Sequence, residues 1–234
     1  MRIFFTLQYL GTRYAGWQTQ ANAVGIQQVV EDALAKLFGT AVRVEGAGRT
    51  DAGVHARAQR AHADVPFEIP ERGLILGVND ALPHDIRVTA AERVADDFHC
   101  RFAAKAKTYR YRIWNAPVAD VFAYATHAHV AQALDAARMH DAAQALAGTH
   151  DFAAFTVASP EVTTTVRTIE SIDVARERDA ILITVTADGF LRYMVRRIAG
   201  TLIEVGRGSL GGVSFAEARW TAPAKGLVLW DVRY

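Results

Sequence analysis

The sequence predicts an α+β protein of two similar halves, each with a mostly antiparallel sheet and helices packed on it. Segments that alternate apolar and polar residues, typical of strands, are interspersed with segments in which apolar residues recur every three or four positions, typical of helices. Near residue 105 a second series of this kind begins, so we expect one half over 1–104 and another over 105–234. A cleft between two such halves would suit an active site.

The first half is expected to contain two helices among several strands. From residue 26 the apolar positions follow the spacing of an amphipathic helix, and Gly39 ends it. A second, short helix is expected over 74–82. Alternation and branched or aromatic residues predict strands over 2–10, 42–46, 59–65 and 86–91.

The second half repeats this mixture. The stretch 107–114 alternates with period two, as the first strand does. An alanine-rich helix is expected over 130–146, closed by Gly148, and His150 and Asp151 are expected in a turn. A further helix is expected over 190–205, where the apolar residues fall on one face. Further strands are expected over 163–174, 180–187 and 226–234.

Composition places the chain among folded cytoplasmic proteins. Of its 234 residues, 51% are hydrophobic and 22% are charged. The single cysteine, Cys100, excludes an intrachain disulfide and fits a reducing compartment. The apolar part of the N-terminus is too short for a signal peptide, and no apolar run is long enough to span a membrane. We therefore expect a cytoplasmic location and no membrane partner.

The distribution of charged residues along the chain says more about binding partners than the net charge does. A net charge of +1 does not by itself indicate a nucleic-acid binder. The stretch 98–119, however, has no acidic residue and five basic ones, and a second basic cluster lies within 192–197. Such clusters can bind phosphates. They are equally compatible with solvated strand faces whose charges are matched elsewhere in the fold.

The segment 46–56 concentrates residues that carry chemistry. Three of its residues are glycines within eight positions, which predicts a loop with backbone that bulkier residues could not adopt. The loop also contains Arg49, Asp51 and His55. A carboxylate on a loop held by a strand can act as a base, a metal ligand or a nucleophile. The structural alternative is an Asx-turn in which Asp51 caps its own loop and Arg49 is solvated.

The eight residues from Arg49 to Ala56, Arg-Thr-Asp-Ala-Gly-Val-His-Ala, resemble the signature of the TruA-type tRNA pseudouridine synthases. The resemblance covers nearly the whole chain. One matching segment, Phe98 to Phe102, has Cys100 where alanine is expected, and a buried cysteine is a similarly small apolar residue. Other matching segments lie within 9–20, around Tyr109, and within 148–152, 190–200 and 222–227.

The resemblance implies a role for each matching residue. Asp51 corresponds to the catalytic aspartate, Tyr109 to the tyrosine that stacks on the target base, and Arg196 to the arginine that pairs with the aspartate. Arg49 corresponds to the arginine that helps to extrude the nucleotide. His55 and Arg110 are expected to take part in substrate binding, alongside Tyr109 and Arg49.

The residues alone leave several of these assignments open. The helix pattern does not choose among Arg192, Arg196 and Arg197, because all three fall outside its apolar stripe. Tyr109 suits cross-strand packing as well as base stacking. His55 could equally hold the loop by hydrogen bonds.

The chemistry of uridine isomerisation explains why these residue types are needed. Uracil must leave C1′ through N1, turn over and rejoin through C5. A carboxylate beside the anomeric carbon can attack it, or it can remove the 2′ proton to give a glycal, and the sequence does not decide between these routes. Either route needs an ionised Asp51, and a paired guanidinium would keep it charged.

The resemblance further implies action on uridines 38, 39 and 40 of the tRNA anticodon stem-loop, and a homodimer that holds one tRNA. We expect no cofactor, because no nucleotide-binding fingerprint follows a strand. We also expect no metal, because the spacing of His55, His99 and His150 gives no close ligand pair. Two alternatives are an RNA-uridine isomerase with another target site and a non-catalytic protein that binds or folds tRNA.

Overall fold

The computed structural model describes residues 1–157 and 162–234, which form two compact units. The first unit comprises Met1–Lys105 together with Leu229–Tyr234, and the second comprises Ala106–Val228. Where the sequence suggested halves over 1–104 and 105–234, the last six residues therefore group with the first unit. Both units combine antiparallel strands with helices, which confirms the predicted α+β class.

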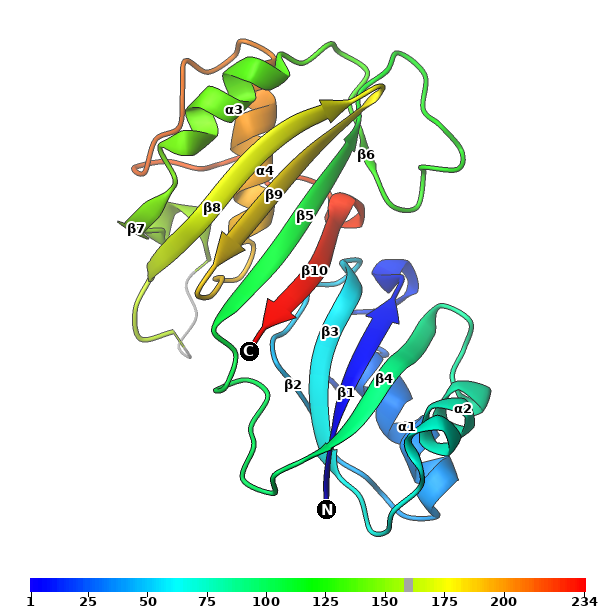
Figure 1. Ribbon diagram of the computed structural model, residues 1–234. Helices are drawn as coiled ribbons and strands as arrows, with labels where there is room; N and C mark the ends of the chain where they lie inside the picture. Colours follow the sequence, from blue (N-terminus) through cyan, green and yellow to red (C-terminus); the bar gives the residue numbers. More distant parts are fainter. Residues whose placement is uncertain (158–161) are drawn as a thin grey trace. The chain divides into compact units, whose positions relative to one another are not determined.

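Strand β1 (Arg2–Tyr9) is central in the sheet of the first unit (Figure 1). It pairs antiparallel with β3 (His55–Asp64) on one side and β4 (Ile86–Val94) on the other. The short β2 (Val44–Gly46) pairs with β3, and β10 (Leu227–Arg233) is the next neighbour of β3. Strand β1 takes this position because its aromatic and aliphatic side chains are buried.

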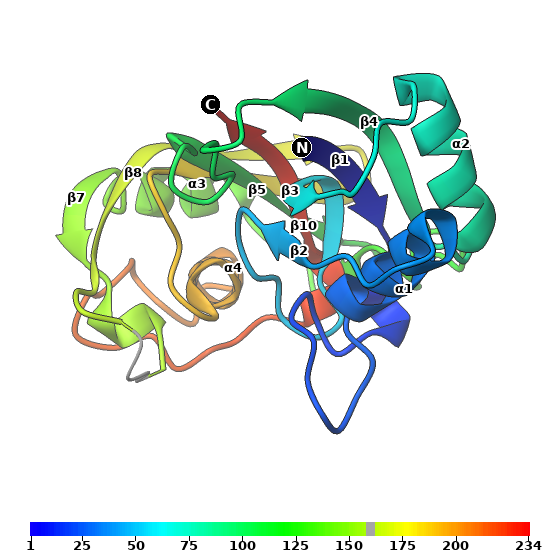
Figure 2. The same cartoon turned by 90° about the horizontal axis from the view of Figure 1, so that it is seen from below.

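Helix α1 (Ile26–Phe38) confirms the predicted amphipathic helix. It ends at Gly39, whose φ of +69° is the left-handed conformation that glycine adopts without strain. Helix α2 (Glu71–Ala81) packs against α1 and β4 (Figure 2). The buried Gln27 of α1 donates a hydrogen bond of 2.8 Å to the carbonyl of Val44, so a side-chain amide ties α1 to β2.

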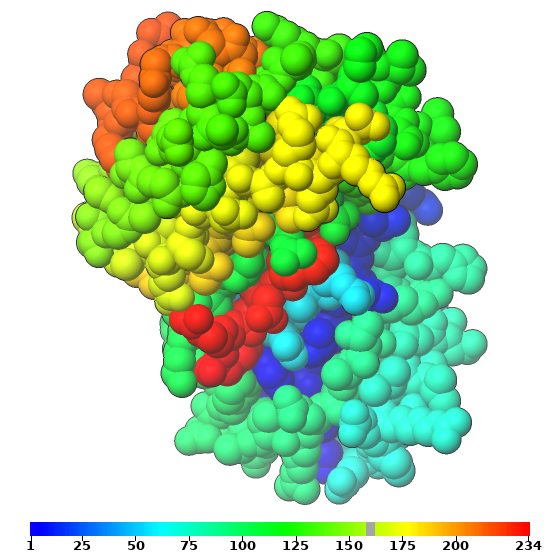
Figure 3. All heavy atoms as spheres, turned by 45° about the horizontal axis from the view of Figure 1, so that its top comes forward, coloured from blue at the N-terminus to red at the C-terminus, as the bar shows by residue number. Residues whose placement is uncertain are grey.

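The second unit is built around the antiparallel order β5–β9–β8–β7. These strands are β5 (Ala106–Trp114), β9 (Ala180–Ala187), β8 (Val166–Glu177) and β7 (Gly148–Asp151). Helices α3 (Ala136–Gln144) and α4 (Met194–Gly206) pack on this sheet and on each other (Figures 1 and 2). The space-filling view shows the β8–β9 hairpin, in yellow, at the surface of the unit (Figure 3).

The helix predicted over 130–146 was wrong in its first part. Helix α3 begins at Ala136, and β6 (Ala128–His129) precedes it and pairs parallel with β5. The buried amide of Asn115 explains the difference. It donates to the carbonyls of Val130 and Gln132, each at 2.8 Å, and accepts from the backbone N–H of Leu134 at 3.2 Å. Backbone groups that a helix would use are thus bound to a side chain.

Two smaller predictions also needed correction. Residues 150 and 151, expected in a turn, belong to strand β7, where Thr149 Oγ1 lies 2.9 Å from Thr168 Oγ1 of β8. Helix α4 begins at Met194 rather than near residue 190, because Tyr193 has a φ of +65° and cannot continue a right-handed helix. Hydrophobic periodicity reports neither the pairing of β7 with β8 nor the positive φ of Tyr193.

Of the helices within 1–157 and 162–234, none is both long and apolar enough to cross a lipid bilayer.

Replacement of Asn115 by alanine is expected to lower the free energy of unfolding by about 2–3 kcal/mol, because it leaves buried carbonyl and N–H groups without their partner. Urea denaturation of the purified protein measures this change. Asn22→Ala, at an exposed position, serves as the control and should change the value by less than about 0.5 kcal/mol. Equal stabilities of the two variants would contradict the role given to Asn115.

Candidate active site

The loop between β2 and β3 presents Asp51 at a half-buried position between a buried and an exposed neighbour. Thr50 is buried, Ala52 is exposed, and Arg49 is also exposed. The backbone N–H of Val54 donates to the carbonyl of Asp51 at 3.1 Å, which closes a tight turn around the carboxylate. Asp51 is therefore held on a rigid turn. Because it is only half-buried, a substrate arriving from solvent can contact it.

A second loop, residues 10–18, holds this turn in place and is called the strap below. The N–H of Trp17 donates to the carbonyl of Thr50 at 3.0 Å, and the N–H of Gly53 donates to the carbonyl of Tyr14 at 3.2 Å. These two backbone hydrogen bonds fall on either side of Asp51 in the sequence. The strap thus fixes the turn from both ends.

Two glycines of the strap make this close approach possible. A Cβ atom built on Gly11 would lie 1.9 Å from the carbonyl oxygen of Val54. A Cβ on Gly16 would lie 2.5 Å from the carbonyl oxygen of Thr50, and Gly16 also has a φ of +91°. Any side chain at these positions would force the strap and the Asp51 turn apart.

The third predicted residue of the loop, His55, is buried and points into this packing. Its Nδ1 accepts a hydrogen bond of 2.9 Å from the backbone N–H of Gly11. This contact gives His55 a role in joining the turn to the strap, which was one of the two interpretations drawn from the sequence. Its participation in substrate binding stays a prediction.

Beneath the turn, Thr50 forms a buried polar contact with Tyr9 of β1. The two hydroxyl oxygens lie 2.8 Å apart, and Gln59 of β3 donates to the carbonyl of Gly48 at 2.9 Å. Burial raises the pKa of Tyr9 above its usual range, so its hydroxyl keeps its proton. The turn is therefore supported from below by side chains of two sheet strands.

The strap is itself anchored at its outer side by Asp85. The hydroxyl of Tyr14 donates to Asp85 Oδ1 at 2.7 Å, and the N–H of Leu10 donates to the carbonyl of Asp85 at 2.9 Å. Burial, followed by the contact with Asp85, raises the pKa of Tyr14 to about 12. The phenol thus remains a donor through the neutral pH range.

In the second unit, Tyr109 lies on β5 with its side chain in the core face, 7% exposed. Its ring meets Phe190 edge to face, with centroids 5.0 Å apart. Two residues along, Tyr111 is fully buried and donates to the carbonyl of Pro223 at 2.9 Å. Both tyrosines thus share one face, as alternation predicts, whereas Arg110 lies on the opposite face of β5 and is half-buried.

The three arginines that periodicity could not separate have different surroundings. Arg196 Nε donates to the carbonyl of Ala222 at 2.9 Å, and its guanidinium lies 5.1 Å from the centre of the Tyr193 ring. Arg197 donates to the carbonyls of Ala154 and Thr156, at 2.8 and 2.7 Å, which is a structural use. Arg192 is exposed and lies over the same Tyr193 ring. Arg196 alone of the three is both half-buried and not used to hold residues 153–156.

The structure brings Arg49, Asp51 and His55 together in the first unit, and it places Tyr109, Arg110 and Arg196 in the second. The pairing of Asp51 with Arg196 stays a prediction. Sequence reasoning missed the strap's part in fixing Asp51, although the close spacing of Gly11 and Gly16 around two aromatic residues is a signal of tight loop packing. It also missed a cluster of Glu45, His62 and His99, whose ligand atoms lie within 4.8 Å of one another.

Comparison with known proteins gives a consistent picture. A family model described as "tRNA pseudouridine synthase" matches residues 6–103 and 142–234. The chain is 44% identical over 237 residues to "tRNA pseudouridine synthase A" of Syntrophotalea carbinolica, covering 97% of this chain and 94% of that protein. It is 43% identical to the proteins of the same name from Pelobacter propionicus, covering 99% of both chains, and Myxococcus xanthus, covering 100% of this chain and 92% of that protein.

A chain of the "Crystal Structure of a Cbf5-Nop10-Gar1 Complex" is 12% identical, with a TM-score of 0.35 over 86% of this chain and 45% of that chain. A likeness at this level says nothing about fold or function.

Replacement of Gly11 by alanine is expected to lower the free energy of unfolding by about 3 kcal/mol, because the added methyl group overlaps the carbonyl of Val54. Gly73→Ala, in helix α2, is the matched control, since its Cβ would meet only Ile69 Cγ2 at 3.4 Å. The control should raise stability by about 0.5–1 kcal/mol through helix propensity. Urea denaturation of both variants measures these changes. A Gly11→Ala protein as stable as wild type would contradict the close packing of the strap.

Proposed function

Because the chain belongs to the tRNA pseudouridine synthase family, it is an isomerase of uridine in tRNA, and we propose that it acts on uridines 38, 39 and 40 of the anticodon stem-loop. The family resemblance supports these target positions, and the observation that carries the catalytic part of the proposal is the rigid placement of Asp51. Catalytic groups act best when their position is fixed before the substrate binds. The strap and the buried Thr50 give Asp51 that fixed position without burying it completely.

We propose that Asp51 acts at the ribose of the target uridine, either by attack on C1′ or by removal of the 2′ proton. In both routes the carboxylate must be ionised when uracil departs. The family resemblance supplies Arg196 as its partner, and the hydrogen bond to Ala222 orients that guanidinium.

Substrate binding is assigned to aromatic and basic residues. A uridine within a stem must be extruded, at a cost of a few kcal/mol, before its ribose can reach a side chain. Stacking on an aromatic ring offsets about 1–3 kcal/mol of that cost. We propose Tyr109 for this stacking and exposed Arg49 for the extrusion, with Arg110 and His55 completing the binding set.

We further propose a homodimer that holds one tRNA and works in the cytoplasm. The family resemblance supports the dimer, and the single cysteine supports a reducing compartment. Uridine and pseudouridine are isomers, so the reaction consumes no oxidant or reductant, and this supports catalysis without a redox cofactor.

Asp51→Asn is expected to lower the isomerisation rate by at least about 1,000-fold, because an amide neither attacks C1′ nor takes the 2′ proton. Release of tritium from tRNA labelled at C5 of uridine measures the rate, since forming the C5–C1′ bond expels that hydrogen. Binding of tRNA should persist. Asp97→Asn, at an exposed turn in the same unit, is the control and should retain the wild-type rate.

The outcomes of this experiment separate the alternatives. Wild-type turnover by Asp51→Asn would exclude the proposed catalytic aspartate. Release from wild type at uridines other than 38–40 would favour an isomerase with another target site. Binding of tRNA without any release by wild type would favour a non-catalytic tRNA-binding protein.

Arg196→Lys is expected to slow single-turnover isomerisation about 10- to 100-fold, because lysine keeps the charge and loses the planar guanidinium and its bond to Ala222. Affinity for tRNA should change by less than about threefold, since lysine still attracts phosphate. Arg192→Lys, on the same segment and exposed, should keep the wild-type rate. Equal rates for the two variants would remove the reason for choosing Arg196.

A further inference from the structure

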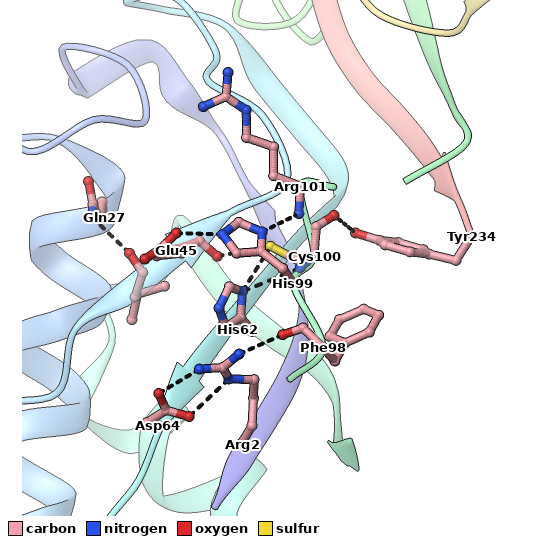
Figure 4. Close-up of polar contacts among 11 residues, drawn as sticks. Arg2, Gln27, Glu45, His62, Asp64, Phe98, His99, Cys100, Arg101 and Tyr234 are labelled. Carbon is pink, nitrogen blue, oxygen red and sulfur yellow. Dashed lines mark hydrogen bonds and ion pairs between the residues drawn. The ribbon is translucent and has the colours of Figure 1, made fainter. Parts of the chain in front are cut away.

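A compact group of potential metal ligands lies in the first unit, on segments that the isomerase chemistry does not use. Glu45 of β2, His62 of β3 and His99 in the turn after β4 each offer one ligand atom, and these atoms lie within 4.8 Å of one another (Figure 4). Glu45 and His62 are directly opposed in the β2–β3 pairing, so their side chains lie on one face. Two imidazoles and a carboxylate form a common ligand set for divalent transition metals.

The turn that carries His99 is fixed to the sheet on both sides of this residue. Arg2 Nη1 donates to the carbonyl of Phe98 at 2.8 Å, and the hydroxyl of Tyr234 donates to the carbonyl of Cys100 at 2.8 Å (Figure 4). The N–H of Phe102 donates to the carbonyl of His99 at 3.1 Å and closes the turn. His99 is therefore delivered to β2 and β3 by a preformed loop, so its backbone needs no ordering when an ion binds.

The surroundings of His62 allow the tautomer that would bind a metal through Nε2. The Cys100 thiol donates to the carbonyl of Glu45 at 3.2 Å, and its sulfur, 3.2 Å from His62 Nδ1, can accept a hydrogen bond when that nitrogen carries the ring proton. In the other tautomer the backbone N–H of Cys100 donates to the same nitrogen at 3.5 Å, a long hydrogen bond that an ion at Nε2 would replace. With the proton on Nδ1, the lone pair of Nε2 is available, and ligating histidines usually donate their other N–H in this way.

His62 is only 4% exposed, so it forms the inner side of the cluster.

His99 and Glu45 already face each other at the open side of the cluster. His99 Nε2 lies 3.0 Å from Glu45 Oε2, and the N–H of Arg101 donates to His99 Nδ1 at 3.2 Å. An ion bound at Nε2 would take the place of its proton, the ring proton would move to Nδ1, and the ring would tilt away from the N–H of Arg101 so that both N–H groups bind water. The charges balance because the ring stays neutral and the carboxylate stays ionised.

We propose that Glu45, His62 and His99 form a binding site for a divalent transition-metal ion, with zinc as its natural occupant. Zinc prefers imidazole and carboxylate ligands at about 2.0–2.2 Å, so the ligand atoms of a tetrahedral site lie about 3.3–3.6 Å apart. His99 Nε2 and Glu45 Oε2 are already 3.0 Å apart, and binding of the ion would need rotation of the His99 and Glu45 side chains, the latter 57% exposed, to bring all distances in the cluster into that range. Water occupies the fourth position on the exposed side.

The ion would join β2 and β3 to the turn 98–102, three segments that otherwise meet through hydrogen bonds and ring contacts. Its role is structural, because the reaction needs no Lewis acid at this place and the ligands are separate from the Asp51 turn. This proposal replaces the sequence-based expectation of no metal. Spacing along the chain gave no ligand pair, whereas strand pairing provides one between residues 45 and 62.

The test uses the full chain after treatment with a chelator and its removal. Isothermal titration with zinc chloride should show one site per chain, and cobalt(II) should give the visible absorption bands of a tetrahedral nitrogen and oxygen site. Glu45→Gln and His99→Gln change side chains that are already partly exposed to solvent. Each should weaken zinc binding at least about tenfold. His84→Gln, an exposed histidine of the same unit, is the matched control and should bind zinc as wild type does.

A thermal melt of each protein with and without zinc provides the second readout. At the same zinc concentration, zinc should raise the midpoint for wild type and His84→Gln by clearly more than for the two ligand variants, because stabilisation follows the affinity of the folded state for the ion. Absence of stoichiometric binding, or equal binding by all four proteins, would overturn the proposal. Circular dichroism of the metal-free variants checks that they are folded, and the isomerase assay is not needed for any of these outcomes.

Discussion

The structure of the candidate site depends on the close approach of two loops, at a distance that only glycine permits. Gly11 and Gly16 bring the backbone of the strap within van der Waals distance of Val54 and Thr50. The backbone hydrogen bonds of Tyr14 and Trp17 then fall on both sides of Asp51, and His55 completes the joint. Without that approach the Asp51 turn would be a surface loop with no fixed geometry.

Buried polar side chains have a comparable role elsewhere in the chain. Gln27 joins α1 to β2, Thr50 joins the Asp51 turn to Tyr9, and Asn115 holds the extended segment before α3. In each case an amide or hydroxyl binds backbone or side-chain groups that would otherwise be buried without a partner. These contacts specify where segments lie, while the apolar faces of β1, α1 and α4 provide most of the driving force for folding.

The sequence predicted the elements whose signal is local. The apolar stripe and Gly39 located α1 at its correct bounds, and alternation located β5 and β9 within one residue at each end. Prediction from sequence failed where a residue far away along the chain determines the backbone conformation. Residues 130–135 have helical composition, but Asn115, which directly follows β5, takes hydrogen bonds of that segment. Strand β7 is short and polar, and its pairing with β8 defines it.

By itself, then, the sequence determined the α+β class, the family and the loop that carries Arg49, Asp51 and His55, because motif and periodicity are properties of neighbouring residues. Only the tertiary structure decided how the strap holds Asp51 and which arginine of 192, 196 and 197 is engaged with residues 153–156. It also decided that Glu45, His62 and His99 converge. The physical reason is that strand register places Glu45 beside His62, 17 positions later, and the anchored turn places His99, a further 37 positions along, beside both. No spacing along the chain predicts that these residues meet.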